Sequence, residues 1–238
     1  IVAIKRRADL LGLVRNNAKQ SRLARLRIPR NDKFFNDPNP LNAYWAGFIA
    51  ADGCISNYQS NNRRYEVKLG LHVKDLGHLQ RFCQDSQWGG RITIRQNGVS
   101  EICRVTVTGA EPWVTDLWNI WSIGLRKTWN LHAPIGCPEN LIPAYIAGYI
   151  DGDGCIHTRK GTKRHRIIVV GTYYILKWIS DWAESISKFK QGVIVFRRGC
   201  YRINISSYSV PTIWNEVSRF DIPLLQRKWQ RFLGGDSE

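Results

Sequence analysis

Two aspartates, Asp52 and Asp153, each end a short apolar segment and are followed directly by glycine. The segments are Trp-Ala-Gly-Phe-Ile-Ala-Ala-Asp-Gly at 45–53 and Ile-Ala-Gly-Tyr-Ile-Asp-Gly-Asp-Gly at 146–154. Two carboxylates brought together repel each other unless a cation lies between them. Their hard oxygen ligands suit Mg²⁺, and metal beside a scissile phosphate can supply hydroxide and stabilise the leaving oxygen. This spacing makes a metal-dependent nuclease centre a candidate.

The two aspartates occupy corresponding positions of an internal repeat, with an offset of 101 residues. The same offset relates Trp113 to Trp214, and it relates Lys127 to Lys228, each of which follows an arginine. Matches at both ends of so long a unit indicate a duplicated domain.

Each repeat contains the same predicted order of elements, αββαββα, so the fold class is α+β. Val67, Leu69 and Leu71 alternate with polar or small residues, which is typical of a half-buried strand. The expected helices are 43–51, 75–86, 112–123, 144–150, 174–186 and 208–217, the last with Pro211 in its first turn. The expected strands are 54–60, 64–73, 91–95, 101–108, 155–159, 166–171, 193–196 and 201–205.

The Ala-Gly pair of each motif explains how the aspartates could meet. Small residues allow two helix backbones to approach closely, so the motif helices can form the contact between the halves. If they pack side by side in parallel, their ends bring Asp52 and Asp153 together. We assign the tryptophans of the amphipathic helices to core packing: Trp113, Trp118, Trp121 and Trp214.

Residues 1–40 lie outside the repeat and have a different character. Leucines among basic residues predict two short helices around a turn, loosely similar to part of a helix-turn-helix motif, and Asn36–Pro40 predicts a linker. We therefore expect an extension at 1–40, which is either a DNA-binding arm or a basic leader, with a first repeat at 41–135 and a second at 136–238.

Composition narrows the class of protein. Lys and Arg total 35 against 19 Asp and Glu, a net charge of +16, which favours a polyanionic partner such as nucleic acid over the alternative of a merely basic or ribosome-associated protein. The six cysteines form no CxxC pair, so a structural zinc site is not expected.

No apolar run is long enough to cross a membrane, and no signal peptide is evident. We expect residence wherever the host DNA is, in the cytoplasm or an organellar matrix, without secretion. Because the chain starts at Ile1 and contains no methionine, we expect that its true N-terminus is missing.

The two nine-residue motifs resemble those of single-chain LAGLIDADG homing endonucleases, and through the repeat the resemblance covers about residues 41–235. It implies two pseudo-twofold αββαββα repeats that form a saddle of antiparallel sheets over DNA. It implies metal ligation by the final aspartates, Asp52 and Asp153, and by the backbone carbonyls of Ala51 and Gly152. The earlier acidic position is Asp151 in one motif and alanine in the other, so the halves are not expected to be equivalent.

The resemblance also implies a basic residue near the end of each repeat, close to the scissile phosphates. The repeat offset nominates Lys127 and Lys228, for which the alternative is a solvated surface lysine. A lysine there could activate water or stabilise developing phosphate charge. A polar residue at the start of the helix after the first hairpin often helps in this family; Asp75 and Tyr173 lie there, although Asp75 could simply cap the helix.

The outward faces of the strands predict a DNA-reading surface, because their polar and cationic side chains suit the edges of bases in the major groove. The alternative is an ordinary solvated sheet face. The predicted contacts are Ser56, Tyr58, Arg64, Lys68, His72, Arg91, Thr93, Arg95, Arg104, Thr106, His157, Arg159, Arg166, Arg197, Arg202, Asn204 and Ser206, with Lys160, Lys163 and Arg164 in a turn that could meet phosphate.

Three functions fit these features. The first is a monomeric, Mg²⁺-dependent endonuclease that cuts one phosphodiester in each strand of a specific DNA duplex, as in intron homing. The second is a maturase that binds intron RNA, because a basic face serves RNA as well as DNA. The third is a transcription regulator without catalysis, against which the presence of both Asp52 and Asp153 argues. The sequence does not separate the first from the second.

Overall fold

The structure is a computed structural model, described here for residues 28–59, 64–158 and 165–230. Its centre is a pair of helices, α3 (Pro40–Asp52) and α7 (Ile142–Asp153). Asn39 caps α3 by accepting from the backbone amides of Leu41 and Asn42, and Pro40 fits the first turn because it needs no hydrogen-bond partner there. Every residue from Asn42 to Ala51 is buried. A helix that is apolar all round must be enclosed on all sides, and this one is.

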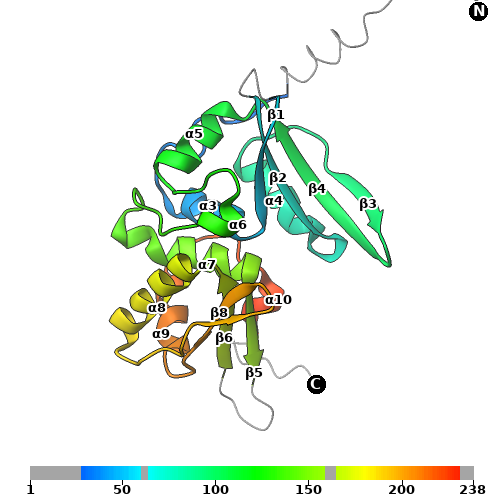
Figure 1. The fold of residues 1–238 in the computed structure, drawn as a ribbon. Helices are drawn as coiled ribbons and strands as arrows, with labels where there is room; N and C mark the ends of the chain where they lie inside the picture. The colour runs from blue at the N-terminus through cyan, green and yellow to red at the C-terminus, as the bar shows by residue number, and fades with distance from the viewer. Residues whose placement is uncertain (1–27, 60–63, 159–164, 231–238) are drawn as a thin grey trace, which may run out of the picture.

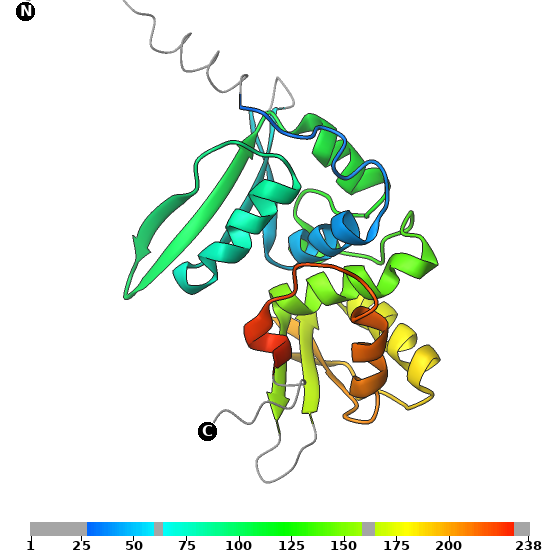
Figure 2. The ribbon, with the colours of Figure 1, turned by 180° about the vertical axis from the view of Figure 1, so that it is seen from behind.

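The first half contains a four-stranded antiparallel sheet in the order β1-β2-β4-β3. Its strands are β1 (Gly53–Gln59), β2 (Arg64–His72), β3 (Thr93–Asn97) and β4 (Ser100–Thr108). The predicted alternation on β2 is confirmed, because Val67, Leu69 and Leu71 are buried. Helices α4 (Leu76–Asp85) and α5 (Glu111–Asn119) pack on that buried face (Figures 1 and 2).

The second half repeats this arrangement, with the sheet order β5-β6-β8-β7. Its strands are β5 (Gly154–Thr158), β6 (His165–Gly171), β7 (Val195–Arg197) and β8 (Cys200–Ile205). Helices α8 (Tyr173–Ser187) and α9 (Val210–Val217) cover its buried face, and Pro211 lies in the first turn of α9 as predicted. Short helical segments complete the described chain: η1 (Val73–Asp75), α6 (Lys127–Asn130), η2 (Glu139–Leu141) and α10 (Gln226–Trp229).

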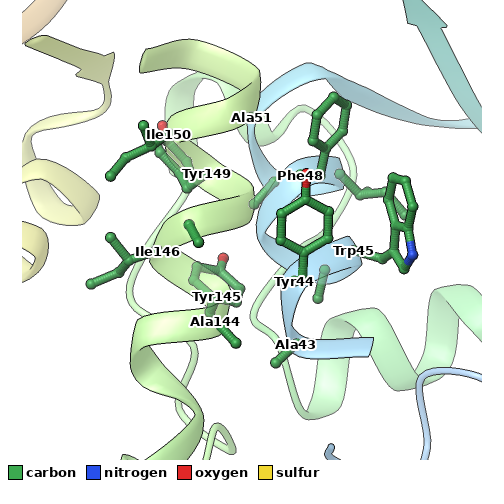
Figure 3. Packing of buried hydrophobic residues seen from close by; sticks show 14 of the residues in the cluster. Ala43, Tyr44, Trp45, Phe48, Ala51, Ala144, Tyr145, Ile146, Tyr149 and Ile150 are labelled. Atoms are coloured by element: carbon green, nitrogen blue, oxygen red, sulfur yellow. The ribbon is translucent and has the colours of Figure 1, made fainter. Parts of the chain in front are cut away.

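The two motif glycines set the distance between α3 and α7. A methyl group on Gly47 would lie 1.9 Å from the carbonyl oxygen of Tyr145, and one on Gly148 would lie 1.9 Å from that of Tyr44. The contact is therefore reciprocal, as a pseudo-twofold relation between the repeats requires. Figure 3 shows the two helices side by side, with Ala43 and Ala144 also on this seam. The predicted close approach of small residues is confirmed.

Two details differ from the sequence-based expectation. Phe34 and Phe35 are buried in the core, and the indoles of Trp113 and Trp121 donate to the carbonyls of Asn31 and Phe35. This part of the predicted extension therefore packs with the first half, and Pro40 begins a helix instead of ending a linker; the two helices predicted before residue 28 lie outside the described residues.

The second difference concerns one of the four core tryptophans. Trp118 is 61% exposed, because α5 buries the face of Trp113 and Leu117, and Trp118 is rotated about 100° from Leu117. Trp113 and Trp121 are fully buried, and Trp214 packs against the core as predicted. Within the described residues, no helix is both long and apolar enough to cross a membrane.

Candidate nuclease centre and nucleic-acid interface

The motif aspartates lie where the two central helices end side by side. The ends are in contact, because a methyl group on Gly152 would lie 2.3 Å from the Cβ atom of Ala51 and 3.3 Å from the backbone nitrogen of Asp52. Asp52 is exposed and Asp153 is half-buried. Each is the last residue of its helix and is followed by an extended glycine that starts a strand. The repeat thus places two carboxylates at one seam, as the sequence predicts.

The environment of these carboxylates disfavours two negative charges. Desolvation by the surrounding protein raises the pKa of Asp153 to about 6, and repulsion by Asp52 adds to this effect. Desolvation also raises the pKa of Asp52, while Lys228 and then Lys127 oppose the rise. Two carboxylates that are hard to ionise together form a site that a cation would stabilise.

Both nominated lysines lie at this centre, and each caps the motif helix of its own repeat. The Nζ atom of Lys127 lies 2.7 Å from the carbonyl oxygen of Ala50 and 2.5 Å from that of Ala51. The Nζ atom of Lys228 lies 2.5 Å from the carbonyl oxygen of Asp151 and also contacts the carbonyls of Ile150, Gly152 and Gly154. An ammonium group at a helix C-terminus satisfies carbonyls that have no partner within the helix. The alternative of a solvated surface lysine is therefore wrong for both.

Each lysine interacts electrostatically with both motif aspartates, and Lys228 interacts most strongly with Asp151 of its own repeat. Lys228 is the first of the charges that lower the pKa of Asp52, and Lys127 is the first of those that lower the pKa of Asp153. Burial lowers the pKa of both lysines. Lys127 and Asp153 also line one cavity of about 540 Å³, with Tyr173 and Tyr201 on its wall. One composite half-site is therefore Asp153 with Lys127, which share this cavity, and Asp52 with Lys228 makes up the rest of the centre.

The carboxylates at the seam fit Mg²⁺ only if substrate phosphate and water supply its other ligands. Among the described residues, no group of three or more His, Cys, Asp or Glu side chains could hold a metal ion. Mg²⁺ commonly uses one or two carboxylates together with substrate phosphate and water, so Asp52 and Asp153 suffice as its protein carboxylates. The carbonyls of Ala51 and Gly152, predicted as further ligands, already accept from Lys127 and Lys228. A metal there would need the second lone pair of each oxygen or a shift of the lysine.

Most of the predicted DNA-reading side chains that are described lie on the uncovered face of each sheet, whereas Arg91 and Ser206 lie outside the strands, before β3 and after β8. Strand register places Lys68 opposite Thr106, and Thr93 opposite Arg104, on the face away from the helices. In the second half it places His157 opposite Arg166. None of the predicted residues whose side chains are described is buried. Lys68 is engaged by Glu66, whose carboxylate lies 2.6 Å away, and by the Ser56 hydroxyl.

Five predicted contacts have side chains that are not described. Tyr58 lies on β1, but only its backbone is described. Arg159, Lys160, Lys163 and Arg164 lie outside the described residues. The second-half face also carries Ile168 and Val170, which strand register places beside Asn204 and Arg202. The two faces therefore differ, with an apolar stripe in the second half.

Comparison with solved structures identifies the fold to which this architecture belongs. No protein-family model and no curated protein matches the sequence. The homing endonuclease I-WcaI, solved bound to its DNA recognition sequence, superposes with a TM-score of 0.56 at 15% identity, over 92% of this chain and 96% of that chain. LAGLIDADG meganuclease I-CpaMI, solved bound to uncleaved DNA, gives 0.54 at 15% identity over 83% and 90%. Mesophilic variants of the homing endonuclease I-DmoI give 0.53 at 19% identity over 84% and 97%.

The chain has the LAGLIDADG homing endonuclease fold. At these identities the likeness establishes the fold, and it confirms the predicted α+β class with its two pseudo-twofold repeats.

Within the LAGLIDADG fold, the structure assigns Asp75 a partner that sequence reasoning missed. Asp75 occupies the N-cap position of α4 as predicted, but its side chain makes no capping hydrogen bond. Its carboxylate instead accepts two hydrogen bonds from Arg227, at 2.8 and 2.7 Å. Arg227 comes from the other repeat, immediately before Lys228. Tyr173, the residue nominated with Asp75, is half-exposed in the cavity beside Lys127 and Asp153.

Asp151 is the second residue whose role the sequence did not reveal. It is 1% exposed, and its carboxylate accepts from the Tyr44 hydroxyl at 2.8 Å, the Leu225 amide at 2.8 Å and the Trp229 indole at 2.7 Å. Burial raises its pKa to about 6, against the opposing effect of these donors. The only available signal was its mismatch with Ala50 in the first motif, which indicates non-equivalent halves but not this network.

Proposed function

We propose that this protein is a site-specific endonuclease that hydrolyses one phosphodiester in each strand of duplex DNA, with a divalent metal, as a monomer. The observation that supports this most is the pair of composite half-sites. Two aspartates and two lysines converge at one seam, and Lys127 shares a cavity with Asp153 of the other repeat. Two similar half-sites related by a pseudo-twofold axis match the approximate twofold symmetry of the two strands of a DNA duplex.

The uncovered sheet faces support duplex DNA as the substrate. Each presents cationic and polar side chains on antiparallel strands, among them Arg95, Arg104 and Arg202. Side chains of this kind donate to phosphate oxygens and to base edges in the major groove. The net charge of +16 adds a salt-dependent attraction to the DNA backbone. In the solved complexes of I-WcaI and I-CpaMI, proteins of the same fold are bound to DNA.

Asp52 and Asp153 would hold the metal, and the lysines would act on phosphate. A bound divalent ion would supply a hydroxide nucleophile and stabilise the leaving oxygen. Lys127 and Lys228 place ammonium groups in a partly desolvated site, where a positive charge stabilises developing phosphate charge more strongly than in water. Their carbonyl contacts fix the position of Nζ relative to the helix ends, so the charge needs little reorganisation during the reaction.

The deciding experiment is cleavage of a randomised duplex library in the presence of Mg²⁺. We expect enrichment of one family of cut sites with the wild-type protein. Asp52→Asn and Asp153→Asn each remove one carboxylate charge at nearly constant volume, and both are expected to abolish double-strand cutting. Asp181→Asn is the matched control, because Asp181 pairs with Lys177 on the exposed surface of α8. It should cut as the wild type does.

The outcomes separate the functions. Cleavage that is lost in Asp52→Asn and retained in Asp181→Asn supports the endonuclease and its two carboxylates. Cleavage that persists in the Asp52→Asn, Asp153→Asn double variant would place the chemistry elsewhere. Tight binding of duplex DNA without cutting by the wild type would reject an endonuclease, and selective binding of structured RNA would point to an RNA partner instead.

A further inference from the structure

The two half-sites differ in the contacts that hold their lysines in place. The difference lies in the chain segments around Lys127 and Lys228. The segment of Lys228 is held by the Asp151 carboxylate, which binds the Leu225 amide and the Trp229 indole on either side of it. In the first repeat the position that corresponds to Asp151 is Ala50 of α3, which offers no side-chain acceptor to the segment of Lys127. This segment therefore lacks any equivalent anchor from that position.

An orphaned hydroxyl marks the position of the missing carboxylate. Tyr44 and Tyr145 correspond through the repeat, and both are fully buried. The Tyr44 hydroxyl donates to Asp151 in the opposite helix. Within the described part of the chain, the Tyr145 hydroxyl is the buried side-chain polar atom without a hydrogen-bond partner. Its partner across the seam would have come from position 50, where alanine offers no acceptor.

A second anchor is also present on one side only. Arg227 forms a bidentate ion pair with Asp75 of the first repeat, which ties the residue before Lys228 to the start of α4. Arg126, its counterpart before Lys127, is exposed with a left-handed backbone, and no ion pair found among the described residues includes it. The contacts of the Lys127 segment with the second repeat are the Thr172 hydroxyl, which donates to the Leu131 carbonyl 2.5 Å away, and the His132 ring, which stacks on Tyr174 with the ring centroids 4.4 Å apart.

We propose that Asp151 and the Asp75–Arg227 ion pair are positioning residues for Lys228 alone, so that the two DNA strands are cut by half-sites of unequal support. This rests on the proposed endonuclease function. The buried carboxylate fixes the segment around Lys228 against α7, and the ion pair fixes it against the first repeat. Removal of either anchor should therefore slow the strand cut by the Asp52–Lys228 half-site and spare the strand cut by Asp153–Lys127.

The test uses the full chain and a duplex with the site selected by the wild type, labelled with a different fluorophore on each strand. Single-turnover rates are measured for each strand with enzyme in excess, after binding of the duplex is measured in Ca²⁺. Arg227→Ala is compared with Arg126→Ala, which removes the same charge at the corresponding position. We expect Arg227→Ala to slow one strand by about tenfold and to accumulate nicked DNA, since small misplacement of a reacting group costs this much or more. Arg126→Ala should leave the two strand rates within about twofold of the wild type.

A merely structural or phosphate-binding role for Arg227 predicts other results. Asp75→Asn keeps the arginine but removes its partner, so positioning predicts that it slows the same strand, and that Arg227→Ala with Asp75→Asn is no slower than either alone. Equal slowing of both strands, no slowing, or additive effects would overturn the proposal. Absence of cutting by the wild type itself would instead overturn the endonuclease function, so the two failures are distinguishable.

Discussion

The reciprocal contact of the motif glycines permits a quantitative prediction for Gly148→Ala. The added methyl group would lie 1.9 Å from the Tyr44 carbonyl oxygen, and ordinary contact begins at 3.4 Å, so α3 and α7 must separate locally by about 1.5 Å. The obstacle is backbone, which cannot rotate away as a side chain can. Overpacking of a core usually costs 1–3 kcal/mol, and we expect about 3 kcal/mol here. The assay is urea unfolding monitored by tryptophan fluorescence.

Gly77→Ala is the matched control for this substitution. Gly77 lies in the first turn of α4, and nothing lies within 4 Å of the position its Cβ would take. It should stabilise the protein by roughly 0.4–1 kcal/mol, because alanine restricts the unfolded chain. Since α7 ends at Asp153, Gly148→Ala should also reduce cleavage by about a hundredfold through displacement of the seam. An unfolding midpoint for Gly148→Ala equal to that of the wild type would refute close backbone packing of the motif helices.

Three further predictions concern the buried network, pH and metal. Asp151→Asn should destabilise the protein by roughly 1–3 kcal/mol, because the new amide nitrogen must face one of the buried groups that donate hydrogen bonds to the carboxylate. The control Asp181→Asn should change the free energy of unfolding by less than about 0.5 kcal/mol. Burial lowers the pKa of His78 from 6.5 to about 4; its stabilising contribution is therefore complete above pH 6.5 and is lost as pH falls towards 4. Between pH 7 and pH 4 the wild type should lose roughly 3 kcal/mol more stability than His78→Gln in urea titrations, and equal losses would contradict a neutral buried imidazole. Chelation of divalent metal with EDTA should abolish cleavage but leave salt-sensitive duplex binding in a gel-shift assay; cutting that survives EDTA would reject metal dependence.

Features that depend on local spacing were determined by the sequence alone. Helix and strand periodicity is a property of neighbouring residues, so the motif helices, the outward faces of the strands and the small-residue seam could be predicted. The repeat offset added Lys127 and Lys228, because a duplicated unit places corresponding residues at corresponding sites. The prediction of a buried Trp118 was wrong because it did not consider which side of the helix this residue occupies. The prediction of a separate extension before the first motif was wrong for Phe34 and Phe35, which are buried in the core.

Only the tertiary structure decided which groups meet across the two repeats. The ion pair of Asp75 with Arg227 joins residues 152 positions apart, and the hydroxyl of Tyr44 reaches Asp151 over 107. No local pattern encodes such contacts, because they depend on how the two repeats dock at the glycine seam. The same docking places Lys127 in a cavity with Asp153 of the other repeat, and it brings the Tyr44 hydroxyl to the Asp151 carboxylate while leaving the Tyr145 hydroxyl without an acceptor. The sequence by itself therefore determined the parts of the centre, its near-symmetry and, through Asp151 against Ala50, the fact that its halves differ, whereas the docking of the halves decided which groups meet there.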